Sequence, residues 1–310
     1  MRLVVVGAGA VGGALAARLW AAKRDVVVVA RGDHGAAIRA RGLRLDGPDG
    51  SITATVASVA RIGELEPRAG DVALMCVKTQ DVAGAADELI AAGFEAAPVA
   101  CLTNGLEAER ACARRFADVH AVVVMSPCEH LSPGLVRQWA APLRGVLDLG
   151  RYPSGHDDVD AALADAFREA GYRSDPQPEI LRSKRTKLLL NLGNAIEALV
   201  GPGGRDSELA RAARAEGVAV FRAAGLAVTS DADDAARRDG LLNLPIGDEA
   251  RRGGSTWQSL ARGAPLETDY LNGEIVLLGR LHGVATPVNA RLQRAVRRAT
   301  APGAMRLDDI

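Results

Sequence analysis

Residues 3–12 read LVVVGAGAVG, an apolar run that leads directly into the pattern G-x-G-x-x-G. The β-branched run predicts a buried strand, and the alanine-rich stretch after the glycines predicts a helix. In that setting the first glycine makes a tight turn, the second lets backbone approach a pyrophosphate, and the third lets the helix pack closely. The alternative interpretation is a plain glycine turn. The context favours a phosphate-binding loop made of Gly7, Ala8, Gly9, Ala10, Val11 and Gly12.

The rest of the first half alternates short apolar runs with alanine-rich segments. Runs that are apolar throughout are typical of a parallel sheet covered on both faces. Residues 135–139 and 145–150 predict an extension of the sheet. This alternation indicates a doubly wound α/β domain of the Rossmann type. We predict strands over 3–6, 26–30, 52–57, 72–77, 99–102 and 121–125, and helices over 11–22, 35–41, 82–92 and 106–116.

The second half has a different pattern. After a predicted helix over 159–170, the Pro-Gln-Pro sequence at 176–178 indicates a boundary, and β-branched runs vanish beyond it. Residues 301–310 are predicted to form a mobile tail. We therefore predict a Rossmann-type dinucleotide-binding domain over 1–175 and an all-helical substrate and catalytic domain over 176–310. The helices expected there cover 179–200, 207–224, 231–242, 266–282 and 287–299.

Charge and composition exclude several classes of protein. The 310 residues carry 38 Lys+Arg and 38 Asp+Glu, so there is no general attraction for nucleic acid or an anionic membrane. No apolar run approaches the roughly 20 residues that span a bilayer, and the N-terminus lacks a signal-peptide pattern. The four cysteines and five histidines show no metal-ligand spacing. We expect a cytoplasmic monomer or homodimer that binds a small molecule and no metal, nucleic acid or membrane.

The residue after the second predicted strand bears on the choice of coenzyme. NAD-selective sites usually place Asp or Glu there to hold the ribose 2′-hydroxyl. Here the strand ends in Arg31, whose guanidinium suits a 2′-phosphate through forked, charge-assisted hydrogen bonds. The nearby Asp33 is an argument for NAD. The alternative interpretation of Arg31 is a solvated surface arginine. The sequence favours NADP (NADPH) over NAD.

Two polar residues follow later predicted strands, and ligands of open α/β sheets bind at those strand ends. Lys78 follows the strand at 72–77, and Asn104 follows the strand at 99–102 with Gly105 behind it. Taken alone, Lys78 is equally well explained as an ordinary exposed lysine, and Asn104-Gly105 as an ordinary turn. We predict that Lys78 and Asn104 line the cofactor site.

The predicted helix at 179–200 is apolar nearly all round, yet Lys187, Asn191 and Asn194 recur at i, i+4 and i+7 on one side. Buried polar groups need partners, so these residues indicate a ligand site; a polar seam toward another helix is the alternative. The chain has only four lysines, and arginine carries the other basic positions. Lysine can be tuned to give up its proton near neutral pH, whereas arginine cannot. Lys187 is therefore a candidate for chemistry.

Ser255 precedes Glu267 by twelve residues, so a turn can bring both to one site. Alone they are better explained as a helix cap and a surface carboxylate. With them, seven motifs fall in the order that the ketopantoate reductase (2-dehydropantoate 2-reductase) family shows, and the chain resembles that family over nearly its whole length. The motifs are the glycine loop, Arg31, Val77-Lys78, Asn104-Gly105, Lys187-x-x-x-Asn191, Ser255-x-x-Gln258 and Glu267-x-Asp269-Tyr270-x-Asn272-Gly273.

The resemblance implies an NADP-dependent oxidoreductase that acts on a CH-OH group. The implied reaction is reduction of 2-dehydropantoate (ketopantoate) to pantoate, in pantothenate and coenzyme A biosynthesis. It also implies a catalytic Lys187 that protonates the developing alkoxide, and a Glu267 that holds Lys187 or the nicotinamide ribose. Asn191, Asn194 and Ser255 would bind the substrate.

The substrate half departs from the family pattern. Many members carry an asparagine eight residues after the catalytic lysine, where this chain has Ala195, and a later Asn-Gly pair is replaced by Gly203-Gly204-Arg205-Asp206. A lost hydrogen-bonding partner changes substrate discrimination. Two alternatives stay open: a reductase of another 2-oxo acid or imine (opine-type or hydroxy acid dehydrogenase), and a non-catalytic NADP-binding protein.

Overall fold

Strand β1 (Arg2–Val6), the apolar run at the start of the chain, lies inside a seven-stranded sheet of order β11-β8-β7-β6-β1-β2-β5. It pairs in parallel with β2 and β6, and only β11 runs antiparallel, against β8. The computed structural model describes all residues, 1–310. The other strands of this sheet are β2 (Val26–Val29), β5 (Ala57–Val59), β6 (Asp71–Met75), β7 (Val99–Cys101), β8 (Val119–Val122) and β11 (Leu149–Arg151).

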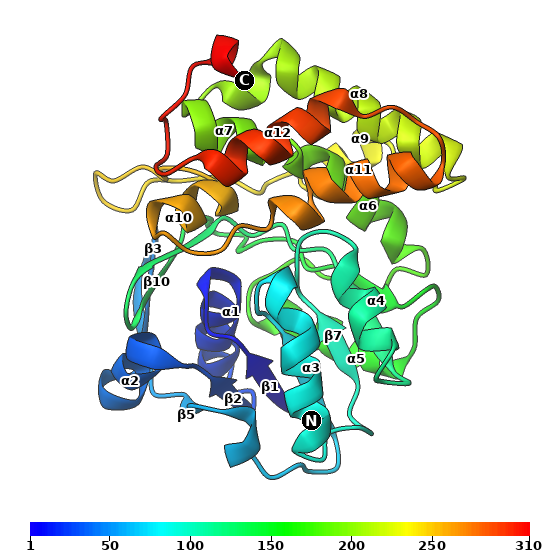
Figure 1. Ribbon diagram of the computed structural model, residues 1–310. Coiled ribbons are helices and arrows are strands. Elements are labelled where there is room, and N and C mark those ends of the chain that lie inside the picture. The colour runs from blue at the N-terminus through cyan, green and yellow to red at the C-terminus, as the bar shows by residue number, and fades with distance from the viewer. The chain divides into compact units, whose positions relative to one another are not determined.

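Alternate residues of β1 are buried on opposite faces of the sheet, which explains why the run is apolar throughout. Leu3 and Val5 belong to the core that contains α1 (Ala10–Ala21) and α5 (Asp158–Glu169). Val4 and Val6 belong to the core that contains α3 (Val82–Ala91) and α4 (Glu107–Ala113). Figure 1 shows α1 and α3 on opposite sides of β1. The predicted doubly wound α/β architecture is confirmed.

A second sheet, of order β4-β3-β10-β9, was only partly predicted. Its strands are β3 (Leu43–Gly47), β4 (Gly50–Ala54), β9 (Cys128–Ser132) and β10 (Leu135–Gln138). The strand predicted over 52–57 is wrong as one element, because β4 and β5 lie in different sheets. In β3 the exposed Arg44 alternates with buried leucines, because only one face of the strand is buried. Such a strand has no continuous apolar run, so the sequence pattern did not predict it.

The chain divides into two compact units. Unit 1 comprises Met1–Thr103, Glu107–Leu181 and Ala235–Arg251, and unit 2 comprises Asn104–Leu106, Arg182–Asp234 and Arg252–Ile310. Beyond the two sheets the helices are α2 (Gly32–Arg41), α6 (Ile180–Asn191), α7 (Asn194–Val200), α8 (Glu208–Ala223), α9 (Asp231–Arg237), α10 (Ser255–Ala261), α11 (Asn272–Leu281) and α12 (Pro287–Arg298). None of the helices combines the length and apolarity that crossing a bilayer requires.

The helix predicted over 179–200 is interrupted at Leu192 and Gly193, where α6 ends and α7 begins. The carbonyl of Leu192 accepts a hydrogen bond of 3.2 Å from Asn272 Nδ2. That amide also donates to Asn289 Oδ1 at 2.9 Å, and Asn289 Nδ2 donates to Glu216 Oε2 at 2.8 Å. A buried carbonyl freed by a helix break needs such a partner. The single predicted helix is therefore corrected to two, and side chains distant in sequence satisfy the carbonyl at the break.

The C-terminal tail, for which the sequence predicted mobility, contacts unit 2. The N–H groups of Gly303 and Met305 donate to the carbonyls of Ala198 and Leu199 at 3.0 Å each. Ile310 packs into the core of unit 2 with Leu199 and Leu292. These contacts satisfy carbonyls in the last turn of α7, which have no partner within that helix.

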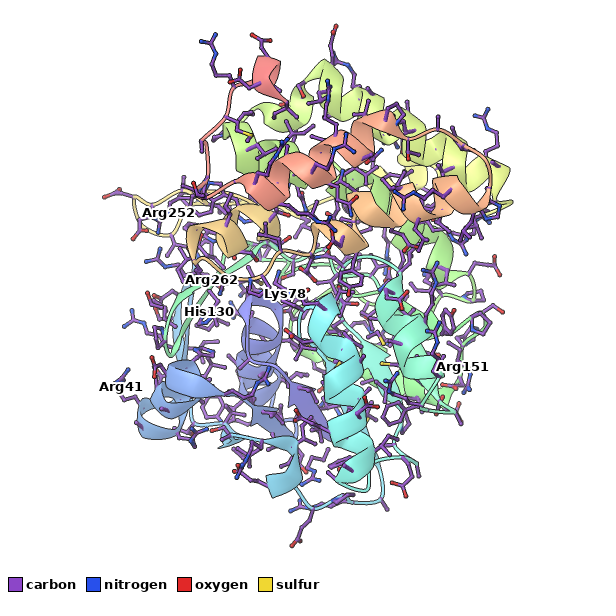
Figure 2. All side chains as sticks on the ribbon, viewed as in Figure 1. Arg41, Lys78, His130, Arg151, Arg252 and Arg262 are labelled. Carbon is purple, nitrogen blue, oxygen red and sulfur yellow. The ribbon has the colours of Figure 1, made fainter.

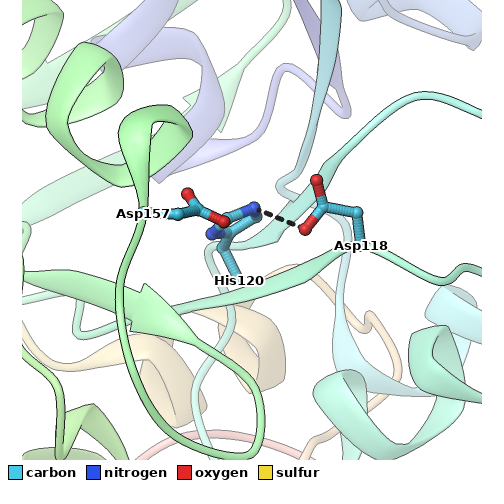
Figure 3. A group of neighbouring side chains, drawn as sticks. All are labelled: Asp118, His120 and Asp157. Carbon is cyan, nitrogen blue, oxygen red and sulfur yellow. Dashed lines mark ion pairs between the residues drawn. The ribbon is translucent and has the colours of Figure 1, made fainter.

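A buried histidine joins three segments of unit 1 (Figure 3). His120 on β8 is 0% exposed; its Nδ1 donates to Asp160 Oδ1 at 2.8 Å, and its Nε2 lies 3.1 Å from Asp118 Oδ1. Arg151 pairs with both Asp118 and Asp157, so a guanidinium lies among these carboxylates. Asp157 and Asp160 also form the capping box of α5. The cluster thereby ties β8 and β11 to the start of α5.

This cluster makes the stability of the protein depend on pH. Burial disfavours the imidazolium, but the hydrogen bond to Asp160 and the charges of Asp160, Asp118 and Asp157 outweigh it and raise the pKa of His120 above 6.5. The stabilisation is therefore fully present below the pKa of the unfolded chain and is lost as pH rises through the folded pKa. We expect the free energy of unfolding of the wild type, measured in urea, to fall more steeply as pH rises above about 6.5 than that of His120→Asn. Equal slopes for the two proteins would contradict the assignment.

Candidate functional site

The glycine loop after β1 has the geometry that its sequence predicts. Gly7 has φ +101°, and a Cβ there would lie 2.9 Å from Val77 Cγ1. A Cβ at Gly12 would lie 2.0 Å from the carbonyl oxygen of Gly7. Both positions therefore need glycine, the first for the turn and the second for the close approach of α1 to the loop. At Gly9 a Cβ would meet no atom within 4 Å, so packing does not explain this glycine.

The start of α1 suits an anionic ligand. Gly9 is its N-cap residue, no side chain caps the helix, and its first turn holds no acidic residue. The first N–H groups of a helix have no partner within the helix, and the helix dipole favours negative charge there. Ala10, Val11 and Gly12 thus present backbone donors of the kind that bind a pyrophosphate.

A cleft of about 320 Å³ opens beside this loop within unit 1. This is within the usual range for ligand sites. Its lining includes Gly7, Ala8 and Gly9, the end of β2, and Arg31. Arg31 is exposed and is the N-cap residue of α2. The cleft also includes His34 and His130, which the sequence did not single out.

Lys78 lies near this cleft but not in its lining. It directly follows Val77, which is a lining residue, and it is the N-cap of the short helix η2 (Thr79–Asp81). Lys78 and His130, which Figure 2 labels, both belong to unit 1. The cofactor role predicted for Lys78 stays a prediction.

Unit 2 brings together polar residues that are far apart in the chain. Lys187 and Asn191 lie one turn apart on α6, so they share a face. Asn191 Nδ2 donates to Asn104 Oδ1 at 3.0 Å, although 87 residues separate them. Lys187 is half-buried and Asn191 is buried. The sequence placed Asn104 and Asn191 at different subsites, and the structure places them in direct contact.

Glu267 lies in the same unit, directly before the short helix η4 (Thr268–Tyr270), and is 5% exposed. The Asn104-Gly105 turn packs against this segment. Gly105 has φ +78°, and a Cβ there would lie 2.8 Å from the carbonyl oxygen of Tyr270. Glycine is therefore required at Gly105 both for its backbone conformation and for this close approach.

Asn194 and Ser255 are linked by residues that sequence reasoning did not use. Asn194 Oδ1 accepts a hydrogen bond from Arg205, and Arg205 Nε donates to Glu197 Oε2 at 3.0 Å. The same carboxylate oxygen accepts the N–H of Gly254 at 3.1 Å, which holds the residue just before Ser255. Asn194 is thus separated from Lys187 and Asn191 by the helix break and is engaged by Arg205. The unusual 203–206 sequence was the available signal, but it did not reveal these partners.

Comparison with known proteins identifies the family. Residues 3–154 match the family described as Ketopantoate reductase PanE/ApbA, and residues 179–300 match its C-terminal counterpart. A 2-dehydropantoate 2-reductase from Halobacterium salinarum is 31% identical, covering 98% of this chain and 100% of its own. The chain belongs to the ketopantoate reductase family. The resemblance predicted from the sequence is confirmed.

Solved structures of the ketopantoate reductase family have the same fold as this chain. A PanE/ApbA family ketopantoate reductase from Ralstonia eutropha is 32% identical with a TM-score of 0.79, covering 96% of this chain and 97% of its own. A D-mandelate dehydrogenase solved with NADH and anilino(oxo)acetate has a TM-score of 0.80 at 19% identity over 96% of this chain and 97% of that one, a likeness of fold. The ketopantoate reductase family comprises dinucleotide-dependent reductases, so the glycine-loop cleft is the coenzyme site expected of a member.

Proposed function

We propose that this protein catalyses the NADPH-dependent reduction of 2-dehydropantoate (ketopantoate) to pantoate. The observation that carries the proposal is the contact between Asn191 and Asn104, one helical turn from the half-buried Lys187. It supports a polar site on α6 that includes the chain's candidate proton donor. Family membership and 31% identity to a 2-dehydropantoate 2-reductase support the same substrate.

Reduction of a ketone requires a hydride on carbon and a proton on the developing alkoxide. The glycine loop and Arg31 would hold NADPH, which would supply the hydride. The ammonium of Lys187 stabilises the alkoxide charge as it forms and then donates the proton to the oxygen. Solvent returns a proton to the neutral amine after product release, so the enzyme is unchanged after one cycle.

The remaining polar residues have orienting roles in this proposal. The amides of Asn104 and Asn191 orient each other through their hydrogen bond and so preorganise this part of the site. Ser255 and Asn194 bind polar groups of the substrate, and Glu267 holds either Lys187 or the nicotinamide ribose. Glu197 and Arg205 act indirectly, because they hold Asn194 and the backbone before Ser255 in place.

A panel of 2-oxo acids tests the proposal. We expect kcat/KM for ketopantoate, measured by NADPH oxidation, to exceed that for 3,3-dimethyl-2-oxobutanoate by about a hundredfold or more. The two acids differ only in the hydroxyl of ketopantoate, and a site built from amides and a serine is left with unpaired groups when that hydroxyl is absent.

Two results would overturn the proposal. Turnover of another 2-oxo acid or an imine in preference to ketopantoate would make the protein a reductase of different substrate class. Binding of NADPH without turnover of any member of the panel would make it a coenzyme-binding protein without this activity.

A further inference from the structure

The wall of the coenzyme cleft contains a histidine whose two ring nitrogens are both used by backbone. The N–H of Gly134 donates to His34 Nδ1 at 2.8 Å, so the proton of the neutral ring is on Nε2, which lies 2.8 Å from the carbonyl oxygen of Ala8. His34 is in the first turn of α2, Ala8 is in the glycine loop, and Gly134 is in the turn between β9 and β10. His34 therefore joins the β9–β10 hairpin to the loop that binds the coenzyme.

A second histidine stacks on the first. The ring centroids of His34 and His130 are 4.0 Å apart with the planes inclined at 49°. His130 is on β9, and its Nδ1 donates to the carbonyl oxygen of Leu135 on β10 at 3.1 Å. Because a carbonyl can only accept, the Nδ1 position is protonated. The hairpin bond and the stacking on His34 together hold the ring in one orientation in the same cleft wall as Arg31.

From this geometry we infer that His130 binds the 2′-phosphate of NADPH together with Arg31, and that it takes up a proton from solvent as the coenzyme binds. The inference rests on the proposed use of NADPH. With its single proton on Nδ1, the neutral ring has no donor at Nε2 for a phosphate oxygen. Protonation at Nε2 supplies both a donor and a positive charge, and charge-assisted hydrogen bonds to phosphate are the strong ones.

The charges around His130 come from several elements. Arg31, which lines the cleft with His130, opposes its protonation, whereas the carboxylates of the lining favour it. A dianionic 2′-phosphate adds negative charge to this set in the NADPH complex, and NADH, which has the same pyrophosphate, brings no such charge. These carboxylates are Asp81 and Glu88.

Two variants distinguish the roles of the two ring nitrogens of His130. Asparagine places an amide where Nδ1 lies, so His130→Asn keeps the bond to Leu135 and removes Nε2. Glutamine places an amide where Nε2 lies, so His130→Gln offers a phosphate a donor that does not titrate. Dissociation constants for NADPH and NADH are measured by coenzyme fluorescence without substrate, at about pH 6, pH 7 and pH 8, the range in which imidazole titrates.

For the wild type we expect the Kd of NADPH to rise by up to about tenfold per pH unit above pH 7, as binding with uptake of one proton requires. His130→Asn weakens NADPH binding by about tenfold at pH 6 and removes this pH dependence. His130→Gln recovers part of the affinity with no pH dependence. NADH binding is unchanged in both variants, and calorimetry in buffers of different ionisation enthalpy detects the proton uptake only with wild type and NADPH.

Other outcomes overturn the inference. Equal losses of NADPH and NADH affinity would assign His130 to the pyrophosphate or to the fold of the hairpin, and unchanged NADPH affinity in His130→Asn would leave it no role in binding. These measurements contain no 2-oxo acid. A protein that binds NADPH as described but does not reduce ketopantoate would refute the proposed substrate while leaving this inference standing.

Discussion

Lys187→Ala is expected to lower kcat for ketopantoate by about a thousandfold, within the range that loss of a general acid produces. The variant loses both the proton donor and the charge that stabilises the alkoxide. Lys187→Arg separates the two effects, because arginine keeps the positive charge but does not release its proton near neutral pH. We expect Lys187→Arg to be impaired nearly as much, with NADPH affinity unchanged in both variants.

Lys23→Ala is the matched control, since it removes an exposed lysine in the turn after α1. Its kcat should equal that of the wild type. Thermal unfolding of all three variants checks that the fold is kept. If Lys187→Ala retained kcat within a few-fold of wild type while the fold was intact, the proposed proton donor would be wrong.

Arg31→Ala is expected to weaken NADPH binding by about a hundredfold and NADH binding by less than about threefold. The guanidinium at the start of α2 lines the coenzyme cleft, and forked hydrogen bonds to a phosphate are each worth about 1.5–3 kcal/mol. NADH has no 2′-phosphate, so its affinity falls little. Dissociation constants from coenzyme fluorescence at one ionic strength measure both effects.

Arg41→Ala is the control for this substitution, because it removes the same charge from the last residue of the same helix (Figure 2). It should leave both affinities near the wild-type values. Parallel losses for NADPH and NADH in Arg31→Ala would show that Arg31 supports the fold of α2 and does not select between the coenzymes.

The glycine loop and the position of Arg31 were predictable from the sequence because their signals are local. Gly7 and Gly12 interact with one another and with the neighbouring strand, and their spacing in the chain already specifies the turn. Arg31 follows β2 directly, so its place at the strand end needs only the strand assignment. The histidines of the cleft were missed because His34 and His130 carry no motif and meet only when β9 folds back onto α2.

For the residues proposed to bind substrate, the sequence supplied the candidates but not their arrangement. Periodicity over 179–200 indicated one helix with three polar residues in line. The carbonyl of Leu192 at the break accepts a hydrogen bond from Asn272, which is 80 residues away, and Asn194 begins a separate helix, α7. Arg205 was noticed as a departure from the family, but its partners Glu197 and Asn194 are reached across a turn that no periodic pattern describes.

By itself, the sequence determined the doubly wound α/β class, the glycine loop and the family, and it supplied the candidate site residues. These depend on hydrophobic period and on residues within one turn or one strand end of each other. Only the tertiary structure decided that Asn104 contacts Asn191, where α6 stops, and which backbone groups orient His34. Those outcomes depend on satisfying buried polar groups with partners that the chain supplies from many residues away.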